Sequence, residues 1–125
     1  MTLDQEQPEM VFDTSLLDEV RQRQRAQLEK ERQTLLAAVL RLLDERGSDY
    51  GIQQAYIFGS LVMPGRFGPD SDVDIAVEQI EPARFFEAVG EFLATLGREI
   101  DLVELARCHF AQRIREKGVL WTKTT

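Results

Sequence analysis

Three aspartates placed inside apolar segments constrain this chain more than any other feature. Asp72 and Asp74 begin an apolar run that ends at Val77, and Asp101 lies within a second apolar run, 100–105. Aspartate is disfavoured in strands, and burial of an unpaired carboxylate costs several kcal/mol. A chain that carries such acids in segments otherwise typical of core strands must compensate their charge. A hard cation, bound by carboxylate oxygens, is the simplest compensation.

The spacing of the acids predicts how they gather. Residues at i and i+2 of a strand point to the same face, so Asp72 and Asp74 are expected side by side. Asp101, from a neighbouring strand, would complete the cluster. The Gly59-Ser60 step that precedes the acids is typical of a turn whose backbone N–H groups and hydroxyl bind phosphate. Together, these residues predict a site for a nucleoside triphosphate with magnesium.

The length and net charge of the chain limit the classes of protein to which it can belong. At 125 residues the chain has room for one core and a single domain. Its net charge of −7 argues against a direct nucleic-acid partner, which requires a basic face. One cysteine excludes an internal disulfide framework, and no apolar run has the length of a membrane span or the pattern of a signal peptide. We therefore expect a cytoplasmic protein without a membrane partner.

The first third of the chain predicts one long helix. Residues 1–13 are acidic, lack Lys and Arg, and are expected to form a flexible tail. A helix is expected over 14–47, ended by Gly47. Its segment 21–34 is almost wholly polar, whereas apolar residues at helical spacing follow over 35–43. The second half should pack on the domain. The first half should either project toward a partner or a second copy, or form a solvated charged helix.

Residues 48–125 are expected to form the core of the domain. Strands are predicted at 55–58, 72–77 and 99–105, helices at 81–96 and 106–117, and a short strand or extended end at 119–121. Six apolar residues predict the buried stripe of the first of these helices: Phe85, Phe86, Val89, Phe92, Leu93 and Leu96. Cys108 and His109 lack further metal ligands at suitable spacing and are interpreted as helix-packing residues. This order predicts an α/β (α+β) fold, with a mixed sheet of three to five strands flanked by helices.

These motifs, in this chain order, resemble the minimal nucleotidyltransferase (MNT) domain of the DNA polymerase β superfamily. The resemblance covers about residues 50–122. It rests on a Gly-Ser step, a loop, an Asp-x-Asp at a strand start and a third acid on a later strand. The matching segments are Phe58-Gly59-Ser60, Pro69-Asp70-Ser71-Asp72-Val73-Asp74-Ile75-Ala76-Val77 and Ile100-Asp101-Leu102-Val103-Glu104-Leu105. The segment Arg113-Ile114-Arg115-Glu116-Lys117-Gly118-Val119-Leu120-Trp121 is similar to the usual ending of these domains. The resemblance implies a small polymerase-β-like domain behind the long helix.

The resemblance also implies a role for each site residue. Asp72, Asp74 and Asp101 would bind two Mg²⁺ ions, and ATP would be the donor substrate. Asp101 would also accept the proton of the attacking hydroxyl. Gly59 would let the backbone approach the phosphates, and Ser60 would hydrogen-bond the β- or γ-phosphate.

The loop between the Gly-Ser step and the acids departs from the family pattern. The loop 61–71 is one residue longer, and its usual small-Arg-Gly step is replaced by residues 62–65. Arg66 is the only basic residue in this loop and is the candidate nucleotide ligand, with a solvated loop arginine as the alternative. For Asp101, the alternative to a metal ligand is a surface ion pair with Arg98.

The function implied by the resemblance is transfer of AMP from ATP to a protein hydroxyl. MNT proteins are antitoxins of HEPN ribonuclease toxins, so a cognate HEPN toxin is the expected partner, and the N-terminal helix is a candidate surface for docking or for homo-oligomer formation. Two alternatives stay open. The domain could neutralise its partner sterically as a non-catalytic binding module, or it could be a nucleotidyltransferase for a small-molecule hydroxyl, as in aminoglycosides.

Overall fold

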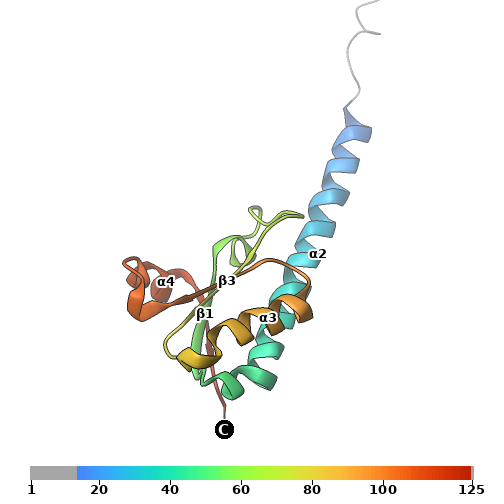
Figure 1. Cartoon of the computed structure of the whole chain (residues 1–125). Coiled ribbons are helices and arrows are strands. Elements are labelled where there is room, and N and C mark those ends of the chain that lie inside the picture. The colour runs from blue at the N-terminus through green and yellow to red at the C-terminus, as the bar shows by residue number, and fades with distance from the viewer. Residues whose placement is uncertain (1–13, 125) are drawn as a thin grey trace, which may run out of the picture.

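The computed structural model describes residues 14–124 and consists of a long helix followed by a sheet with further helices. The expected tail, 1–13, lies outside the described residues. The helices are α2 (Ser15–Arg46), α3 (Phe85–Leu96) and α4 (Ala111–Lys117), and the strands are β1 (Gln54–Phe58), β2 (Val73–Val77), β3 (Ile100–Glu104) and β4 (Val119–Thr122) (Figure 1). The predicted fold class is confirmed. The short segment 119–121, left open as a strand or an extended end, is a strand.

The sheet is mixed and has four strands in the order β3-β2-β1-β4. β1 pairs antiparallel with β2 and with β4, whereas β2 and β3 are parallel. The parallel pair is joined through α3, because parallel strands need a crossover connection that returns the chain to the same end of the sheet. As a result, β2 and β3 both begin at one end of the sheet, and β1 ends there.

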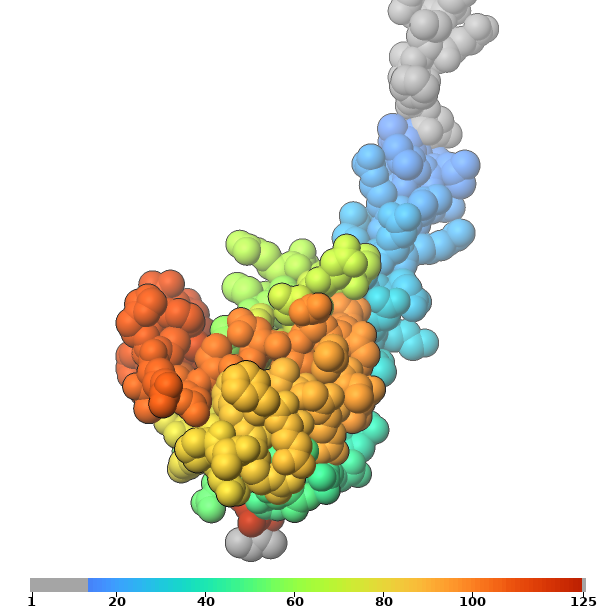
Figure 2. Space-filling view, viewed as in Figure 1, coloured from blue at the N-terminus to red at the C-terminus, as the bar shows by residue number. Residues whose placement is uncertain are grey.

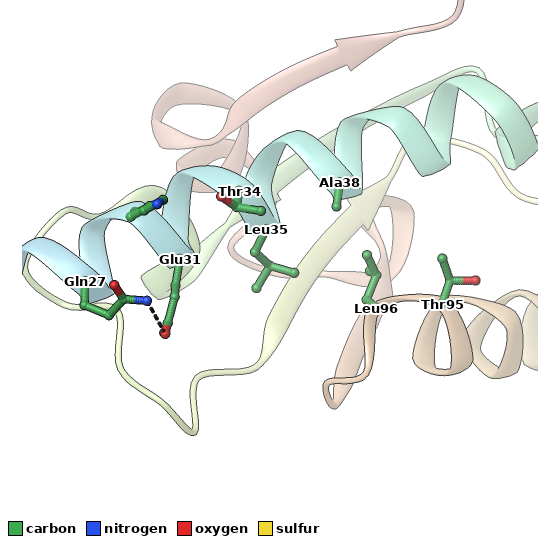
Figure 3. A pocket seen from close by; sticks show the side chains of 8 residues that line it. Gln27, Glu31, Thr34, Leu35, Ala38, Thr95 and Leu96 are labelled. Carbon is green, nitrogen blue, oxygen red and sulfur yellow. Dashed lines mark hydrogen bonds between the residues drawn. The ribbon is translucent and has the colours of Figure 1, made fainter.

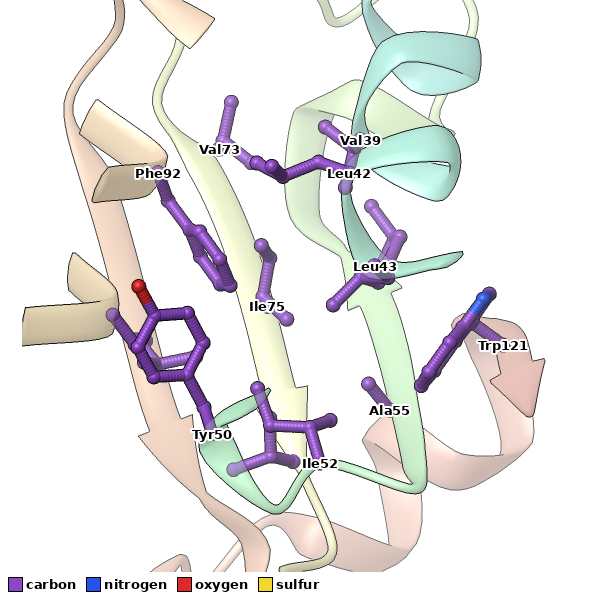
Figure 4. Packing of buried hydrophobic residues seen from close by; sticks show 14 of the residues in the cluster. Val39, Leu42, Leu43, Tyr50, Ile52, Ala55, Val73, Ile75, Phe92 and Trp121 are labelled. Atoms are coloured by element: carbon purple, nitrogen blue, oxygen red, sulfur yellow. The ribbon is translucent and has the colours of Figure 1, made fainter. Parts of the chain in front are cut away.

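The main core lies between one face of the sheet and the helices α2 and α3. It contains Val39, Leu42 and Leu43 of α2, Ala55 and Ile57 of β1, Val73, Ile75 and Val77 of β2, Phe92 of α3 and Leu102 of β3 (Figure 4). The alternate residues of the strands point to the opposite face. There Tyr56, Ala76, Leu105 and Ile114 form a second, smaller cluster, which includes α4. The two faces are therefore covered unequally.

The predicted buried stripe of α3 is wrong at two positions. Phe86 is 84% exposed and Leu93 is 47% exposed, whereas Ala88 and Phe92 are fully buried. The reason is that only one face of α3, formed by residues about four apart in sequence, packs against the core. The apolar residues of α3 extend around the helix beyond this face, so Phe86 and Leu93 stay exposed.

The predicted 106–117 helix is also wrong in its first half. A short 3-10 turn, Leu105–Arg107, comes first, and α4 begins only at Ala111. Cys108 and His109 lie between the two elements rather than in a helix. Cys108 is half-buried beside the second cluster, and His109 is exposed. The packing role predicted for His109 is therefore incorrect.

The polar half of α2 extends beyond the core. Residues 15–27 are exposed, and this part of the helix stands clear of the domain (Figures 1 and 2). Three exposed apolar side chains, Leu16, Leu17 and Val20, lie on it. Arg32 is the exception within the polar segment, because only 9% of it is exposed. None of the helices in residues 14–124 combines the length and the apolar character needed to cross a membrane.

Candidate active site

Two of the predicted acids lie directly opposite each other on neighbouring strands. In the parallel register of β2 and β3, Asp74 pairs with Asp101, and Phe58 of β1 is the partner of Asp74 on the other side. Adjacent strands lie about 4.8 Å apart, so the two carboxylates project from the same face within contact range. Asp74 is half-buried and Asp101 is exposed. Asp101 is therefore the more accessible of the two to a group in solvent.

Asp72 is placed differently from the prediction. β2 begins at Val73, so Asp72 precedes the strand and is exposed. The expectation that Asp72 and Asp74 share one strand is therefore wrong. The reason is that the chain before Val73 forms a turn, in which the Ser71 N–H donates to the Gly68 carbonyl at 3.2 Å.

The charges of the three acids act on one another. Burial raises the pKa of Asp74 to about 6, helped by the negative charges of Asp101 and Asp72 and by a hydrogen bond with Asp101. Among residues 14–124, no salt bridge neutralises any of these three carboxylates. Like charges this close favour a shared proton or a bound cation.

The backbone of Gly59 lies against the Asp74 carboxylate. Gly59 has a φ of 77°, a conformation that side chains rarely adopt, and begins the 3-10 turn Gly59–Val62. A Cβ atom added here would stand 2.1 Å from Oδ2 of Asp74. Only glycine allows this approach. The contact sets the Gly59–Val62 turn, with Ser60 as its second residue, directly beside the acids.

Arg98 fixes the other end of the loop 61–71. Its Nη1 donates to the carbonyls of Ser71, at 2.9 Å, and Gly68, at 3.3 Å. Its guanidinium also lies 4.7 Å from the ring centroid of Phe67, which is buried. The alternative ion pair between Arg98 and Asp101 is therefore wrong, since Arg98 holds the residue that precedes Asp72. Sequence analysis missed this role, although the position of Arg98 just ahead of β3 places it at the start of β2.

A pocket of about 390 Å³ opens beside Gly59, between the end of β1 and α4. Its walls are mostly apolar, and Arg113 and Lys117 supply its two cationic side chains. The lining residues are Phe58, Gly59, Val62, Met63, Phe110, Arg113, Ile114, Lys117 and Gly118. Sequence analysis did not select Arg113 or Lys117, because they are brought here only by the return of the chain through α4 and β4. Arg66 is exposed and is not among the lining residues.

A second hollow, of about 310 Å³, lies between α2 and the C-terminal end of α3 (Figure 3). Leu35, Ala38 and Leu96 form its floor, and a hydrogen bond of 3.3 Å joins Gln27 to Glu31 at its edge. None of the three acids lines it. It therefore offers no chemistry comparable to that of the pocket beside Gly59.

The acids fit a hard cation by their chemistry. Within residues 14–124, no three acidic, histidine or cysteine side chains are arranged closely enough to enclose a metal ion. However, Asp74 and Asp101 adjoin each other, and burial, together with the negative charges of Asp101 and Asp72, raises the pKa of Asp74. Carboxylate oxygens are the ligands that Mg²⁺ prefers. Asp74 and Asp101, with Asp72 from the preceding loop, are the residues that would hold it.

The comparisons with known proteins bear on this geometry. The model of the family described as polymerase beta, nucleotidyltransferase, matches residues 43–124. The chain belongs to this family. The match includes all four strands and every residue of the candidate site. A search of curated proteins finds no match.

Several solved structures are similar in fold to this nucleotidyltransferase. The crystal structure of a toxin–antitoxin with AMP-PNP has 26% sequence identity and a TM-score of 0.55, over 71% of this chain and 73% of that chain. A mutant of the toxin–antitoxin MntA–HpeT has 26% identity and a TM-score of 0.51, over 70% and 71%. The toxin–antitoxin MntA–HepT, at 24% identity and a TM-score of 0.50 over 74% and 73%, shares the fold. These neighbours confirm the resemblance to MNT domains.

The stability of the protein should depend on pH through Asp74. Its pKa is about 6 in the folded chain, above the ordinary value of 3.8. Above pH 6 the folded state therefore carries an unfavourable charge, and this penalty disappears as pH falls below 4, where both states bind the proton. Asp74→Asn should raise the free energy of unfolding by about 1–2 kcal/mol at pH 7.5, allowing for solvent screening, and by nearly nothing at pH 3.5.

Urea denaturation at the two pH values measures this difference. Asp70→Asn is the matched control, because Asp70 is an exposed acid of the loop that precedes β2. Equal stability of Asp74→Asn and the natural protein at pH 7.5 would contradict the penalty that burial and the neighbouring negative charges are expected to place on the charged Asp74.

Proposed function

We propose that this nucleotidyltransferase uses Mg²⁺ to transfer AMP from ATP to a protein hydroxyl, and that it acts as the antitoxin of a HEPN ribonuclease toxin. The observation that carries the proposal is the contact of the Gly59 backbone with the Asp74 carboxylate, directly opposite Asp101. It joins a turn suited to phosphate with a pair of acids suited to a cation. The neighbour solved with AMP-PNP, an ATP analogue, supports a nucleotide at this site.

Each residue of the site has a task in the transfer. Two Mg²⁺ ions held by Asp72, Asp74 and Asp101 would lower the pKa of the attacking hydroxyl and neutralise the leaving pyrophosphate. The Gly59–Val62 turn would hold the β- and γ-phosphates through its backbone N–H groups and the Ser60 hydroxyl.

The reaction is a single displacement at the α-phosphorus of ATP. The acceptor oxygen forms a bond to the α-phosphorus, the bond from that phosphorus to the oxygen bridging to the β-phosphate breaks, and pyrophosphate leaves. Asp101 accepts the proton of the acceptor hydroxyl, in keeping with its exposed position. The direct test follows the label, since α-phosphate label should pass to protein and γ-phosphate label should leave with pyrophosphate.

We assign the pocket beside Gly59 to the nucleotide. Its apolar walls suit a flat base, and Arg113 and Lys117 supply positive charge for the phosphates. This charge compensates for the family's loop arginine, which is absent here. Arg66 stays a candidate nucleotide ligand from the neighbouring loop.

Arg113→Met and Lys117→Met should each weaken binding of Mg²⁺–AMP-PNP about tenfold, because a charge-assisted hydrogen bond contributes about 1.5–3 kcal/mol. Both side chains are exposed, so the free energy of unfolding should change by less than about 0.5 kcal/mol. Titration calorimetry measures the affinity. The control is Arg115→Met on the same helix, whose guanidinium pairs with Glu78 at 2.8 Å. Equal affinity of all three variants would contradict the assignment of the pocket.

The toxin partner is proposed to dock on the exposed half of α2, which is also the candidate surface for a homo-oligomer. The charge that complements a basic, RNA-cutting protein belongs to the chain as a whole, −7, and not to residues 15–27, which carry three Arg against one Asp and one Glu. The proposed setting is the cytoplasm. The exposed side chains Leu16, Leu17 and Val20 favour a second candidate, a steric binding module, because they offer an apolar contact remote from the acids. The two functions differ in one outcome. A steric module neutralises the toxin with Asp74→Asn, whereas an adenylyltransferase does not.

A further inference from the structure

Arg32 is a buried cation in the otherwise exposed polar segment of α2. Its Nε and Nη2 donate to the two carboxylate oxygens of Glu29, at 2.9 and 2.8 Å. Its Nη1 reaches off the helix and donates to the backbone carbonyl of Leu61 at 3.0 Å. Leu61 belongs to the Gly59–Val62 turn, and its side chain is fully buried. Arg32 therefore connects the long helix to the turn that lies against Asp74.

The burial of Arg32 requires an explanation beyond its ion pair. An Arg–Glu pair three residues apart on a helix forms equally well on the surface, where neither group is desolvated. Here the side chain of Arg32 is 10% exposed and that of Glu29 is 38% exposed. Desolvation of a guanidinium is offset when its donors are satisfied. Glu29 accepts from Nε and Nη2 of Arg32, and the Leu61 carbonyl accepts from Nη1. The buried position of Arg32 therefore allows it to bind the backbone of the turn.

Glu29 orients the guanidinium. The hydrogen bond from Arg32 lowers the pKa of Glu29 to about 2, so the pair stays charged throughout the neutral range. The planar, two-pronged pairing fixes the direction of the third donor. The connection is thus insensitive to pH in the neutral range.

The turn has little room to move toward Asp74. A Cβ atom on Gly59 would stand 2.1 Å from Oδ2 of Asp74, so the backbone of Gly59 lies close to this carboxylate. Displacement of the turn would either bring Gly59 closer to the carboxylate or move the turn away from the acids. Misplacement of about 1 Å at a reacting centre is sufficient for a hundredfold loss of rate.

We propose that Arg32 is a positioning residue that holds the Gly59–Ser60 step in register with Asp74 through the Leu61 carbonyl. The effect of Arg32 on catalysis rests on the nucleotide function proposed above. Its effect on the position of the turn does not depend on that function. Within residues 14–124, no hydrogen bond or salt bridge joins Arg32 to any of the three site aspartates, and Arg32 acts through the backbone of the turn.

Hydrogen exchange of the Met63 amide tests this connection, because this N–H donates to the Ser60 carbonyl at 3.1 Å and closes the turn. In Arg32→Met this amide should exchange at least about tenfold faster than in the natural protein. Arg32→Lys retains one donor and should recover part of the protection. Arg46→Met is the matched control, since Arg46 lies on the same helix but pairs with Glu91 of α3. It should leave the Met63 amide unchanged.

Binding of Mg²⁺–AMP-PNP to the same variants gives a second readout. The affinity should fall about tenfold in Arg32→Met, less in Arg32→Lys, and not in Arg46→Met. Unchanged exchange at Met63 in Arg32→Met would overturn the proposal. Faster exchange with unchanged affinity would also overturn it, because the turn would then move without consequence. If the natural protein binds no AMP-PNP, the nucleotide function fails, and the exchange data still decide whether Arg32 holds the turn. If Arg32→Met does not fold, Arg32→Lys carries both comparisons.

Discussion

Asp74→Asn should lower the rate of AMP transfer by at least about a thousandfold while the protein remains folded. Asparagine has nearly the same shape, but it removes the negative charge from the half-buried position opposite Asp101. Loss of a single preorganised electrostatic contact commonly lowers a rate by about 10²–10³, and loss of a metal ligand adds to it. Label transfer from ATP to protein measures the rate, and circular dichroism measures the fold.

Asp70→Asn is the control for this substitution, because it removes the same charge from an exposed position in the preceding loop. It should retain transfer within about twofold, since charges on exposed side chains are screened by solvent and salt. Full activity of Asp74→Asn would exclude Asp74 from the reaction. Equal loss in both variants would indicate a general effect of net charge.

Gly59→Ala should have the second largest effect. Its added methyl group would stand 2.1 Å from Oδ2 of Asp74, so either the carboxylate or the turn must move. In addition, the φ of 77° is unfavourable for alanine by about 1–2 kcal/mol. We expect transfer to fall at least about a hundredfold, as for other small displacements at a reacting centre. The free energy of unfolding should fall by about 2–3 kcal/mol, within the range for strained backbone positions.

Gly65→Ala separates backbone strain from the contact with Asp74. Gly65 has a similar φ of 87°, but a Cβ atom added there meets nothing within 4 Å. It should therefore lose only the backbone contribution to stability and keep its activity. If both glycine variants lose activity equally, strain in the loop rather than the carboxylate contact governs the site.

The sequence predicted the fold through patterns that are local. The apolar face at 35–43, the short apolar strands and the Gly and Pro breakers depend on neighbours in the chain, and each gave an element close to its observed position. The exposed Phe86 was not predictable in this way. Its helical spacing predicts a core residue. The exposure of Phe86 follows instead from how α3 packs against the sheet and α2, which the sequence of the helix does not show. His109 failed similarly, because the 3-10 turn before it delays the start of α4.

The site residues that belong to the sequence motif could be predicted, whereas those outside the motif could not. Chain order and strand alternation brought Gly59, Asp74 and Asp101 to attention, and the register places Asp74 opposite Asp101. Asp72 was assigned to the wrong element, since the loop turn continues up to it. Arg32 and Arg98 were missed for another reason. Their partners are backbone carbonyls distant in sequence, and a carbonyl carries no signature in the sequence.

Transfer of labelled phosphate to protein decides whether this chain is a protein adenylyltransferase. The purified protein would be incubated with Mg²⁺ and extract of host cells, in parallel with ATP labelled in the α-phosphate and in the γ-phosphate, and with Asp74→Asn in place of the natural protein as control. We expect a protein band to take up label from the α-phosphate alone, and Asp74→Asn to abolish this uptake. Label from the γ-phosphate, or α-label that persists with Asp74→Asn, would contradict adenylyl transfer at this site.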